Sequence, residues 1–359
     1  MKIFRNVALI LLTILTVTII FIGVYFNINI SPVDKKDNNN IVVVIPAKTT
    51  TKEIGKILKK EGLIRNAQFF YMYAKIYKIN DLKASTYELK KSMSLKEIIT
   101  TLQKGNSYNP NAVTITFPEG INMRKVAKII ESKTNNSVDD VYNTLKDQKY
   151  LDELINKYWF LTDEIKNSDI YYSLEGYLYP DTYFLSSKDV SVKEIFNLML
   201  DQMNTKLNSI KGDIEKQNMS VHKLLTIASI VELEGVTDED RKGIAGVFYN
   251  RLNKNMSLGS DVTTYYAVKV ELSERNLTQT DIDFVSPYNT RGPQMEGKVP
   301  VGPVSNPSVN SITSALYPTE SNYYYFVADK NRKVYFTKTY NEHLAKIKEL
   351  KTKGVWFEW

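Results

Sequence analysis

The sequence has 359 residues, 43% of them apolar, which is enough for more than one folded unit with a sizeable core. Its 47 basic and 40 acidic residues give a net charge of +7. The absence of cysteine excludes disulfide bonds, thiolate nucleophiles and cysteine metal sites. The two histidines, His222 and His343, match no metal-ligand spacing, so neither a metal site nor a Ser-His triad is expected, and no cofactor is predicted.

The N-terminal segment predicts a membrane anchor. Residues 7–26 carry no charge and are long enough to cross a bilayer, and Lys2 and Arg5 precede them. The positive-inside rule then predicts a cytoplasmic N-terminus, with everything after residue 30 outside. Because the apolar run is long and no small-residue cut site follows it, we predict an uncleaved single-pass anchor in the cell membrane over residues 1–30. A solvated linker over 31–40 follows, rich in charge and asparagine.

Residues 41–105 predict a small basic module. A strand over 41–45, helices over 52–60 and 67–78, and a strand over 85–89 precede a helix capped by Ser94. This order resembles a LysM-type peptidoglycan-binding domain, a βααβ arrangement. Residues 48–104 hold 13 basic and five acidic side chains, a net +8. Outside a membrane, such a surface suits anionic lipid headgroups or acidic wall polymers rather than nucleic acid, although a merely solvated basic surface explains it equally well.

After a second predicted linker over 106–112, residues 113–359 predict a mixed α/β domain. A strand over 113–117 leads through a turn to a helix capped by Asn122, and Thr237 caps a further helix. Strands over 323–329 and 333–337 read as a pair, and a helix over 341–351 closes the chain. The predicted fold class is therefore α+β.

The most apolar helical stretch after the anchor, residues 224–235, ends in two acids. Ser220 is a suitable N-cap and Gly235 a suitable stop. Glu232 lies above Ala228 on the apolar side, and Glu234 points the opposite way. A carboxyl among apolar groups tends to stay protonated near neutrality, as a general acid must. The pattern equally allows a frayed last turn whose acids reach water, and it does not choose between the two glutamates.

Five motifs carry a family resemblance. They are Leu-Glu-Gly-Tyr-Leu-Tyr-Pro-Asp-Thr-Tyr at 174–183, Ala-Ser-Ile-Val-Glu-Leu-Glu at 228–234, Ser-Pro-Tyr-Asn-Thr at 286–290, Gly-Pro-Val-Ser-Asn-Pro at 302–307 and Tyr-Phe-Val-Ala at 325–328. With these motifs the chain resembles, over nearly its whole length, the endolytic murein transglycosylases of the MltG or YceG-like type. The family's catalytic acid directly follows Ala-Ser-Ile-Val, which carries over to Glu232; Glu234 takes at most a supporting role. The chain departs from the family at Leu233, often lysine, at Val301, often proline, and at Ser308, usually glycine.

The resemblance implies a lyase that cleaves the β-1,4 bond between N-acetylmuramic acid and N-acetylglucosamine and leaves a 1,6-anhydro end. Glu232 would protonate the leaving oxygen and then take the proton of the muramic acid C6 hydroxyl as that oxygen attacks C1. Expected partners are peptidoglycan strands and, by family analogy, the cell-wall elongation machinery and penicillin-binding proteins. Motif position gives the substrate-binding candidates, for each of which a loop-stabilising hydrogen bond is the alternative role: Glu175, Asp181, Tyr183, Asp261, Tyr288, Asn289 and Asn306.

Two other functions remain open from the sequence. A hydrolytic muramidase would pair Glu232 with Asp261 or Glu175 as the second carboxylate and would leave reducing ends. A non-catalytic wall-binding scaffold would depend on the LysM-like module alone.

Overall fold

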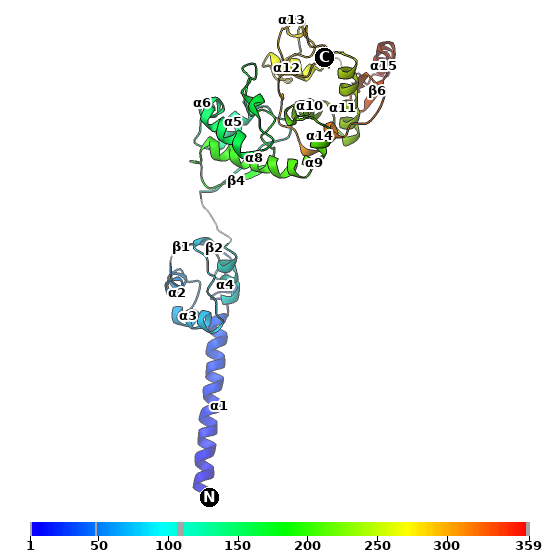
Figure 1. The fold of residues 1–359 in the computed structure, drawn as a ribbon. Helices are drawn as coiled ribbons and strands as arrows, with labels where there is room; N and C mark the ends of the chain where they lie inside the picture. The colour runs from blue at the N-terminus through cyan, green and yellow to red at the C-terminus, as the bar shows by residue number, and fades with distance from the viewer. Residues whose placement is uncertain (1, 47–48, 106–110, 357–359) are drawn as a thin grey trace. The chain divides into compact units, whose positions relative to one another are not determined.

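The computed structural model describes residues 2–46, 49–105 and 111–356, and the chain divides into two compact units, residues 1–111 and 112–359 (Figure 1). Runs of helices separate a few short strands, which confirms the predicted α+β class. The predicted linker over 106–112 lies mostly outside the described residues. Each unit is described by itself.

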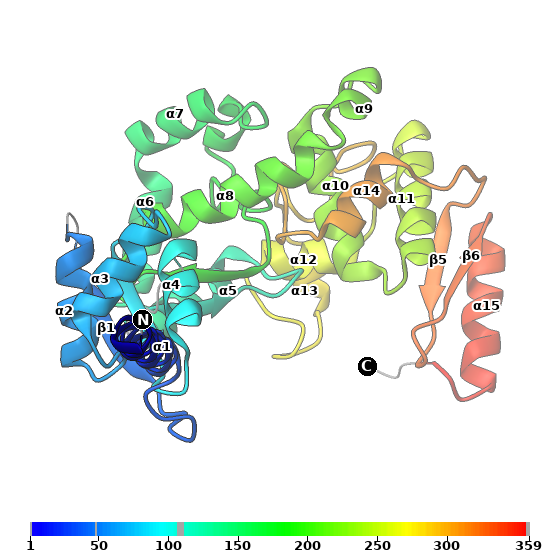
Figure 2. The same cartoon turned by 90° about the horizontal axis from the view of Figure 1, so that it is seen from below.

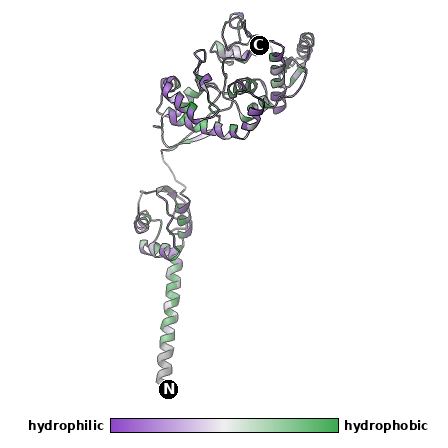
Figure 3. Ribbon diagram, viewed as in Figure 1, coloured by the Kyte–Doolittle hydropathy of each residue, from purple (hydrophilic) through white to green (hydrophobic). Residues whose placement is uncertain are grey.

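The first unit begins with one long apolar helix, α1 (Lys2–Ile30). Its stretch Leu11–Ile30 has a mean hydropathy of 2.3 and is long and apolar enough to cross a membrane (Figure 3). Its direction across the membrane stays a prediction.

The rest of this unit is the predicted basic module. It consists of β1 (Ile41–Ile45), α2 (Thr51–Lys60), α3 (Ala67–Ile76), β2 (Ser85–Leu89) and α4 (Leu95–Lys104). The strands β1 and β2 pair antiparallel, with Ile41 opposite Leu89. Thr50 and Ser94 begin α2 and α4 through capping boxes, because each hydroxyl accepts from an N–H that the helix leaves free. The predicted strand, helix, helix, strand order is present; the likeness to LysM domains stays a prediction.

The second unit contains two further antiparallel strand pairs among many helices. Its first half holds β3 (Val113–Thr116), α5 (Met123–Lys133), α6 (Val138–Lys146), α7 (Gln148–Lys157), the 3₁₀ helix η1 (Asp163–Lys166), β4 (Thr182–Leu185), α8 (Val192–Asn208) and α9 (Lys211–Lys216). Its second half holds α10 (Val221–Glu234), α11 (Asp238–Asn253), α12 (Asp261–Ala267), α13 (Gln279–Ile282), α14 (Val309–Leu316), β5 (Tyr325–Ala328), β6 (Val334–Thr337) and α15 (Tyr340–Thr352). Strand β3 pairs with β4, and β5 with β6.

Helix α10 is the centre of this unit. Every residue from Leu224 to Val231 is buried, and α11, α12 and α14 pack around the helix (Figure 2). Ser220 caps its start, as predicted, by accepting from the Lys223 N–H at 3.1 Å. Gly235 follows its end with extended rather than left-handed backbone, at φ −102°. Position 235 has no room for a side chain, because a Cβ there would lie 2.7 Å from Cγ of Arg241.

Candidate active site

Glu232 lies in the last turn of α10 with its side chain only 6% exposed. Its Oε2 accepts hydrogen bonds from the Ser308 N–H at 2.8 Å and from the Ser308 hydroxyl at 2.6 Å. Its Oε1 is 3.7 Å from Nη2 of Arg241. The apolar groups predicted around this side chain lie along the helix below it, whereas the carboxyl reaches past them to the start of α14. Two donors from Ser308 and the guanidinium of Arg241 are therefore the polar groups that surround the carboxyl.

The end of α10 borders a hollow surface. Leu233, which is 42% exposed, lines three cavities of about 430, 480 and 380 Å³ that therefore adjoin one another. The first is also lined by Glu232, Glu234, Arg241 and residues of the β5–β6 hairpin, among them Arg332. The two glutamates, which point to opposite sides of the helix, thus meet the same cavity. Three adjoining cavities beside the Glu232 carboxyl suit an extended chain of sugars.

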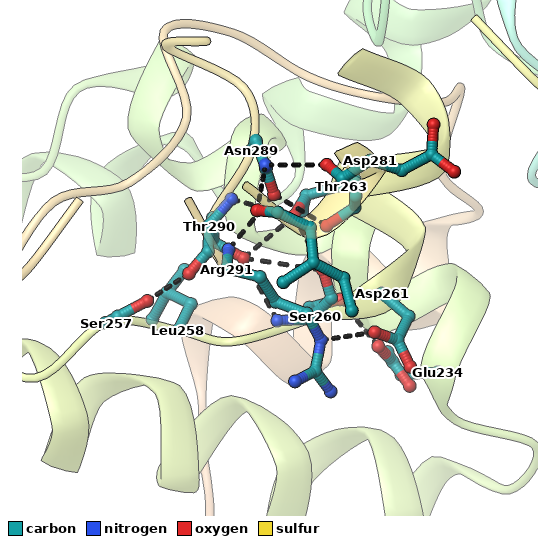
Figure 4. A network of polar contacts seen from close by, with 12 residues as sticks. Glu234, Ser257, Leu258, Ser260, Asp261, Thr263, Asp281, Asn289, Thr290 and Arg291 are labelled. Atoms are coloured by element: carbon teal, nitrogen blue, oxygen red, sulfur yellow. Dashed lines mark hydrogen bonds and ion pairs between the residues drawn. The ribbon is translucent and has the colours of Figure 1, made fainter. Parts of the chain in front are cut away.

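Glu234 lies beside Ser260 and Asp261, away from the partners of Glu232; Figure 4 shows the side of Glu234. Its Oε1 accepts from the Ser260 hydroxyl at 2.6 Å. Burial raises the pKa of Glu234, and the neighbouring Asp261 raises it further, against hydrogen bonding by Ser260 and the charge of Arg291. The predicted binding residue Asp261 forms an ion pair with Arg291 and lines the second cavity together with Glu234. The charged form of Glu234 is therefore less favourable than that of a carboxyl in water.

Asn306 joins three chain segments just before the residue that contacts Glu232. Its Oδ1 accepts from the backbone N–H groups of Gly176, at 3.0 Å, and Leu178, at 3.1 Å. Its Nδ2 donates to the Ile121 carbonyl at 3.1 Å. Ser308 follows two residues later. These hydrogen bonds, the Asn306 clamp, therefore fix the chain segment that brings the Ser308 N–H and hydroxyl to Glu232.

Glu175 is 1% exposed and lies in the same clamp. Its Oε2 accepts from the Met123 N–H and the Tyr266 hydroxyl, each at 2.9 Å, and its Oε1 from Nδ2 of Asn306 at 3.3 Å. Burial raises its pKa to about 7, although the hydrogen bonds from Met123 and Tyr266 and the charge of Arg124 oppose the change. The carboxyl thus ties α5, α12 and two motifs together, and a sugar contact by Glu175 stays a prediction.

Ser229, one turn before Glu232, fastens α10 to the motif at 302–307. Its hydroxyl accepts from the Val304 N–H at 3.0 Å, and its carbonyl accepts from the Ser305 hydroxyl at 3.0 Å. Sequence reasoning did not identify these contacts, nor those of Ser308 and Arg241. For Ser229 and Ser308 the available signal was their place in or beside a family motif.

The motif at 286–290 builds a buried loop. Asn289 is fully buried, and its Nδ2 donates to the carbonyls of residues 281, 282 and 284 while its Oδ1 accepts from Thr264. Figure 4 shows Asn289 beside Asp281. Tyr288, also fully buried, packs its ring 4.7 Å from that of Tyr171 and 4.8 Å from that of Tyr266. Substrate contacts by Tyr288 and Asn289 stay predictions.

Asp181 and Tyr183 lie at β4, and neither lines the three cavities at the end of α10. Asp181 is exposed and accepts from the Thr182 N–H and from Gln202, and the Tyr183 hydroxyl donates to the Tyr179 carbonyl. A sugar contact by either also stays a prediction. Within the described ranges, no cluster of three or more His, Asp or Glu side chains is arranged to hold a metal ion.

Comparison with known proteins gives one consistent family. The model of the YceG-like family matches residues 43–349. A Bacillus subtilis protein named endolytic murein transglycosylase is 35% identical over 327 residues, which cover 90% of this chain and 89% of that protein. A Streptococcus pneumoniae protein of the same name is 36% identical over 334 residues, 89% of this chain; the match spans only 60% of the pneumococcal protein.

A solved structure agrees. The crystal structure of a putative yceG-like protein from Listeria monocytogenes is 37% identical in sequence and aligns with a TM-score of 0.61. The alignment covers 86% of this chain and 99% of the Listeria chain. Taken together with the family motifs around Glu232, these matches show that the chain belongs to the YceG-like family.

Proposed function

We propose that this protein is an endolytic lytic transglycosylase that cleaves the β-1,4 bond between N-acetylmuramic acid and N-acetylglucosamine in peptidoglycan strands. Glu232 is its general acid and base, and the product carries a 1,6-anhydro end. The observation that carries the proposal is the position of the Glu232 carboxyl, buried to 6% exposure yet on the wall of a cavity of about 430 Å³. The relatives named endolytic murein transglycosylase support it.

The hydrogen bonds of Glu232 suggest different roles for its two carboxyl oxygens. Oε2 is held by two donors from Ser308, which leaves Oε1 to carry the transferred proton. As Oε1 protonates the glycosidic oxygen, the C1–O bond breaks, and the Ser308 donors stabilise the carboxylate that forms. The carboxylate then accepts the C6 hydroxyl proton while that oxygen bonds to C1. No water is consumed, so a single carboxyl suffices.

A muramidase would need a second carboxylate beside Glu232, and neither Glu175 nor Asp261 is free to act as one. Glu175 is enclosed by three protein donors, and Asp261 is paired with Arg291 in another cavity. Glu234 lines the same cavity as Glu232, but it points to the opposite side of α10 and its Oε1 is bound by the Ser260 hydroxyl at 2.6 Å. The arrangement therefore favours the lytic route.

We further propose that α1 anchors the protein with its N-terminus in the cytoplasm and both units outside, where wall glycan is found. The LysM-like module would then assist binding of glycan strands. Elongation proteins and penicillin-binding proteins are the partners that the family resemblance suggests.

Purified glycan strands digested by the full-length protein, with mass spectrometry of the new ends, test the activity. The parent should release 1,6-anhydro ends and Glu232→Gln should release none. Glu239→Gln, at an exposed acid in the first turn of α11, is the matched control and should behave as the parent. Anhydro ends that persist in Glu232→Gln would contradict the role of Glu232. Reducing ends alone would indicate a muramidase, and uncut strands a scaffold.

A further inference from the structure

Helix α3 carries an apolar stripe that the protein covers only in part. Phe69, Met72, Tyr73 and Ile76 recur at helical spacing and share one side of the helix. Two of them pack on α1, with the ring of Phe26 lying 5.5 Å from that of Phe69 and 6.1 Å from that of Tyr73. The other two stay open, because Met72 is 53% and Ile76 is 69% exposed.

The start of α3 is fastened to the end of α1. Arg65 donates from Nε to the Ile28 carbonyl at 3.2 Å and from Nη2 to the carbonyls of Pro32 and Val33 at 2.8 and 3.0 Å. Asn66, the N-cap of α3, donates to the Tyr25 hydroxyl at 3.0 Å. These bonds, with the aromatic contacts, hold α3 at one level along α1.

The length of the apolar stretch of α1 determines where α3 lies relative to a bilayer that α1 crosses. Leu11–Ile30 has 20 residues, and at about 1.5 Å per residue it spans about 30 Å, the thickness of a bilayer's hydrocarbon core. The α1 residues that meet α3 and Arg65, from Tyr25 to Ile28, lie in the last two turns of this stretch. Aromatic side chains such as Tyr25 are enriched at that depth, where headgroups begin.

We propose that α3 lies in the interface of the bilayer that α1 crosses, with Met72 and Ile76 immersed at the boundary between headgroups and acyl chains. The exposed part of the stripe belongs to the helix that packs on the end of α1, and the large apolar residues of α1 from Leu11 to Ile22 are themselves more than half exposed. Lys75 and Lys78, exposed at the end of α3, can reach the headgroups while the apolar side stays immersed.

This arrangement gives the basic surface of the module a partner. The module rests on the membrane, and anionic lipid headgroups neutralise part of its net +8 charge over residues 48–104. The inference depends on α1 crossing a bilayer and not on the proposed catalytic activity.

Site-specific depth measurements test it. Because the chain has no cysteine, Met72→Cys and Ile76→Cys each create a single labelling site at an exposed position, where the fold tolerates the change. The full-length variants are labelled with nitrobenzoxadiazole and reconstituted in nanodiscs of phosphatidylglycerol and phosphatidylethanolamine. Lipids that carry nitroxides at different acyl positions then report the depth of the label. Val44→Cys is the matched control, an apolar side chain 59% exposed on β1, which lies away from α1 (Figure 1).

Labels at 72 and 76 should show blue-shifted emission and strongest quenching by shallow acyl nitroxides, at a depth of about 5–10 Å below the headgroups. The label at 44 should emit as in water and escape quenching. Equal spectra and quenching at all three positions would overturn the proposal. Blue-shifted emission at 72 and 76 without lipid quenching would also overturn it, because a protein surface or a second copy of the chain would then cover α3.

Discussion

Replacing Asn306 by alanine should weaken the fold and slow catalysis together. The structure gives this side chain a holding role, since it binds Gly176, Leu178 and Ile121 and precedes the Ser308 donors of Glu232. A residue that only bound sugar would instead raise KM with stability unchanged.

The size of the effect follows from the hydrogen bonds lost. Alanine at 306 leaves two buried N–H groups and two buried acceptors without this partner. An unpaired buried polar group costs about 1–3 kcal/mol, and local relaxation keeps the total near 3 kcal/mol. For a unit of roughly this size, that lowers Tm by about 6–12 °C. Because a displacement of about 1 Å at a reacting group can cost about a hundredfold in rate, kcat should fall by about 10- to 100-fold.

Thermal unfolding of the full-length protein and steady-state cleavage of glycan strands are the two measurements. Asn136→Ala is the matched control, because Asn136 is partly buried and donates to the Val190 carbonyl at 2.8 Å, outside the three cavities. It should lose stability and keep kcat. If Asn306→Ala keeps its Tm while KM rises, the structural role of Asn306 is wrong and its side chain contacts substrate instead.

Three further predictions concern neighbouring residues. Because the pKa of buried Glu175 is about 7 when folded and near 4.5 when unfolded, the free energy of unfolding should fall as pH rises between these values, by up to about 3 kcal/mol. Glu175→Gln should remove that fall. If its free energy of unfolding, measured by denaturation at each pH, still falls as the parent's does, the role of Glu175 is refuted. Gly176→Ala should destabilise by about 2–4 kcal/mol in chemical denaturation, since φ is +83° and a Cβ would lie 2.3 Å from Cβ of Pro303; an unchanged midpoint would count against this. Glu234→Gln should keep most glycan-cleaving activity, because the amide oxygen can accept the Ser260 hydrogen bond in place of the carboxyl; a loss equal to that of Glu232→Gln would assign it a reacting role.

Helix starts were the part of the fold best predicted from sequence. Ser220, Thr237 and Asn122 cap their helices as expected, because each cap depends on a hydrogen bond to a residue three positions away. The same local signal existed for α8, where Ser191 and Glu194 form a capping box, yet no helix was predicted there.

The partners of the proposed acid could not be predicted in this way. The motif selected Glu232, but Ser308 is 76 positions away along the chain and reaches it only through the packing of α14 on α10. The expected apolar setting was wrong for the carboxyl itself, because helical periodicity describes the neighbours one and two turns back and says nothing of what lies beyond the helix end. Binding roles for Asp181 and Tyr183 are likewise undecided by their local sequence.

The two glutamates at the end of α10 acquire different partners from what packs on each side. Glu232 meets the first turn of α14, where the Ser308 N–H and hydroxyl bind one carboxyl oxygen, and Arg241 lies 3.7 Å from the other. Glu234 accepts from the Ser260 hydroxyl at 2.6 Å, and burial, together with the negative charge of Asp261, raises its pKa. Acids two residues apart on one helix thus have different environments, and such differences are how enzymes assign different roles to chemically identical groups. The proposed lytic reaction needs only Glu232, so Glu234 is free to keep α12 and the helix end together.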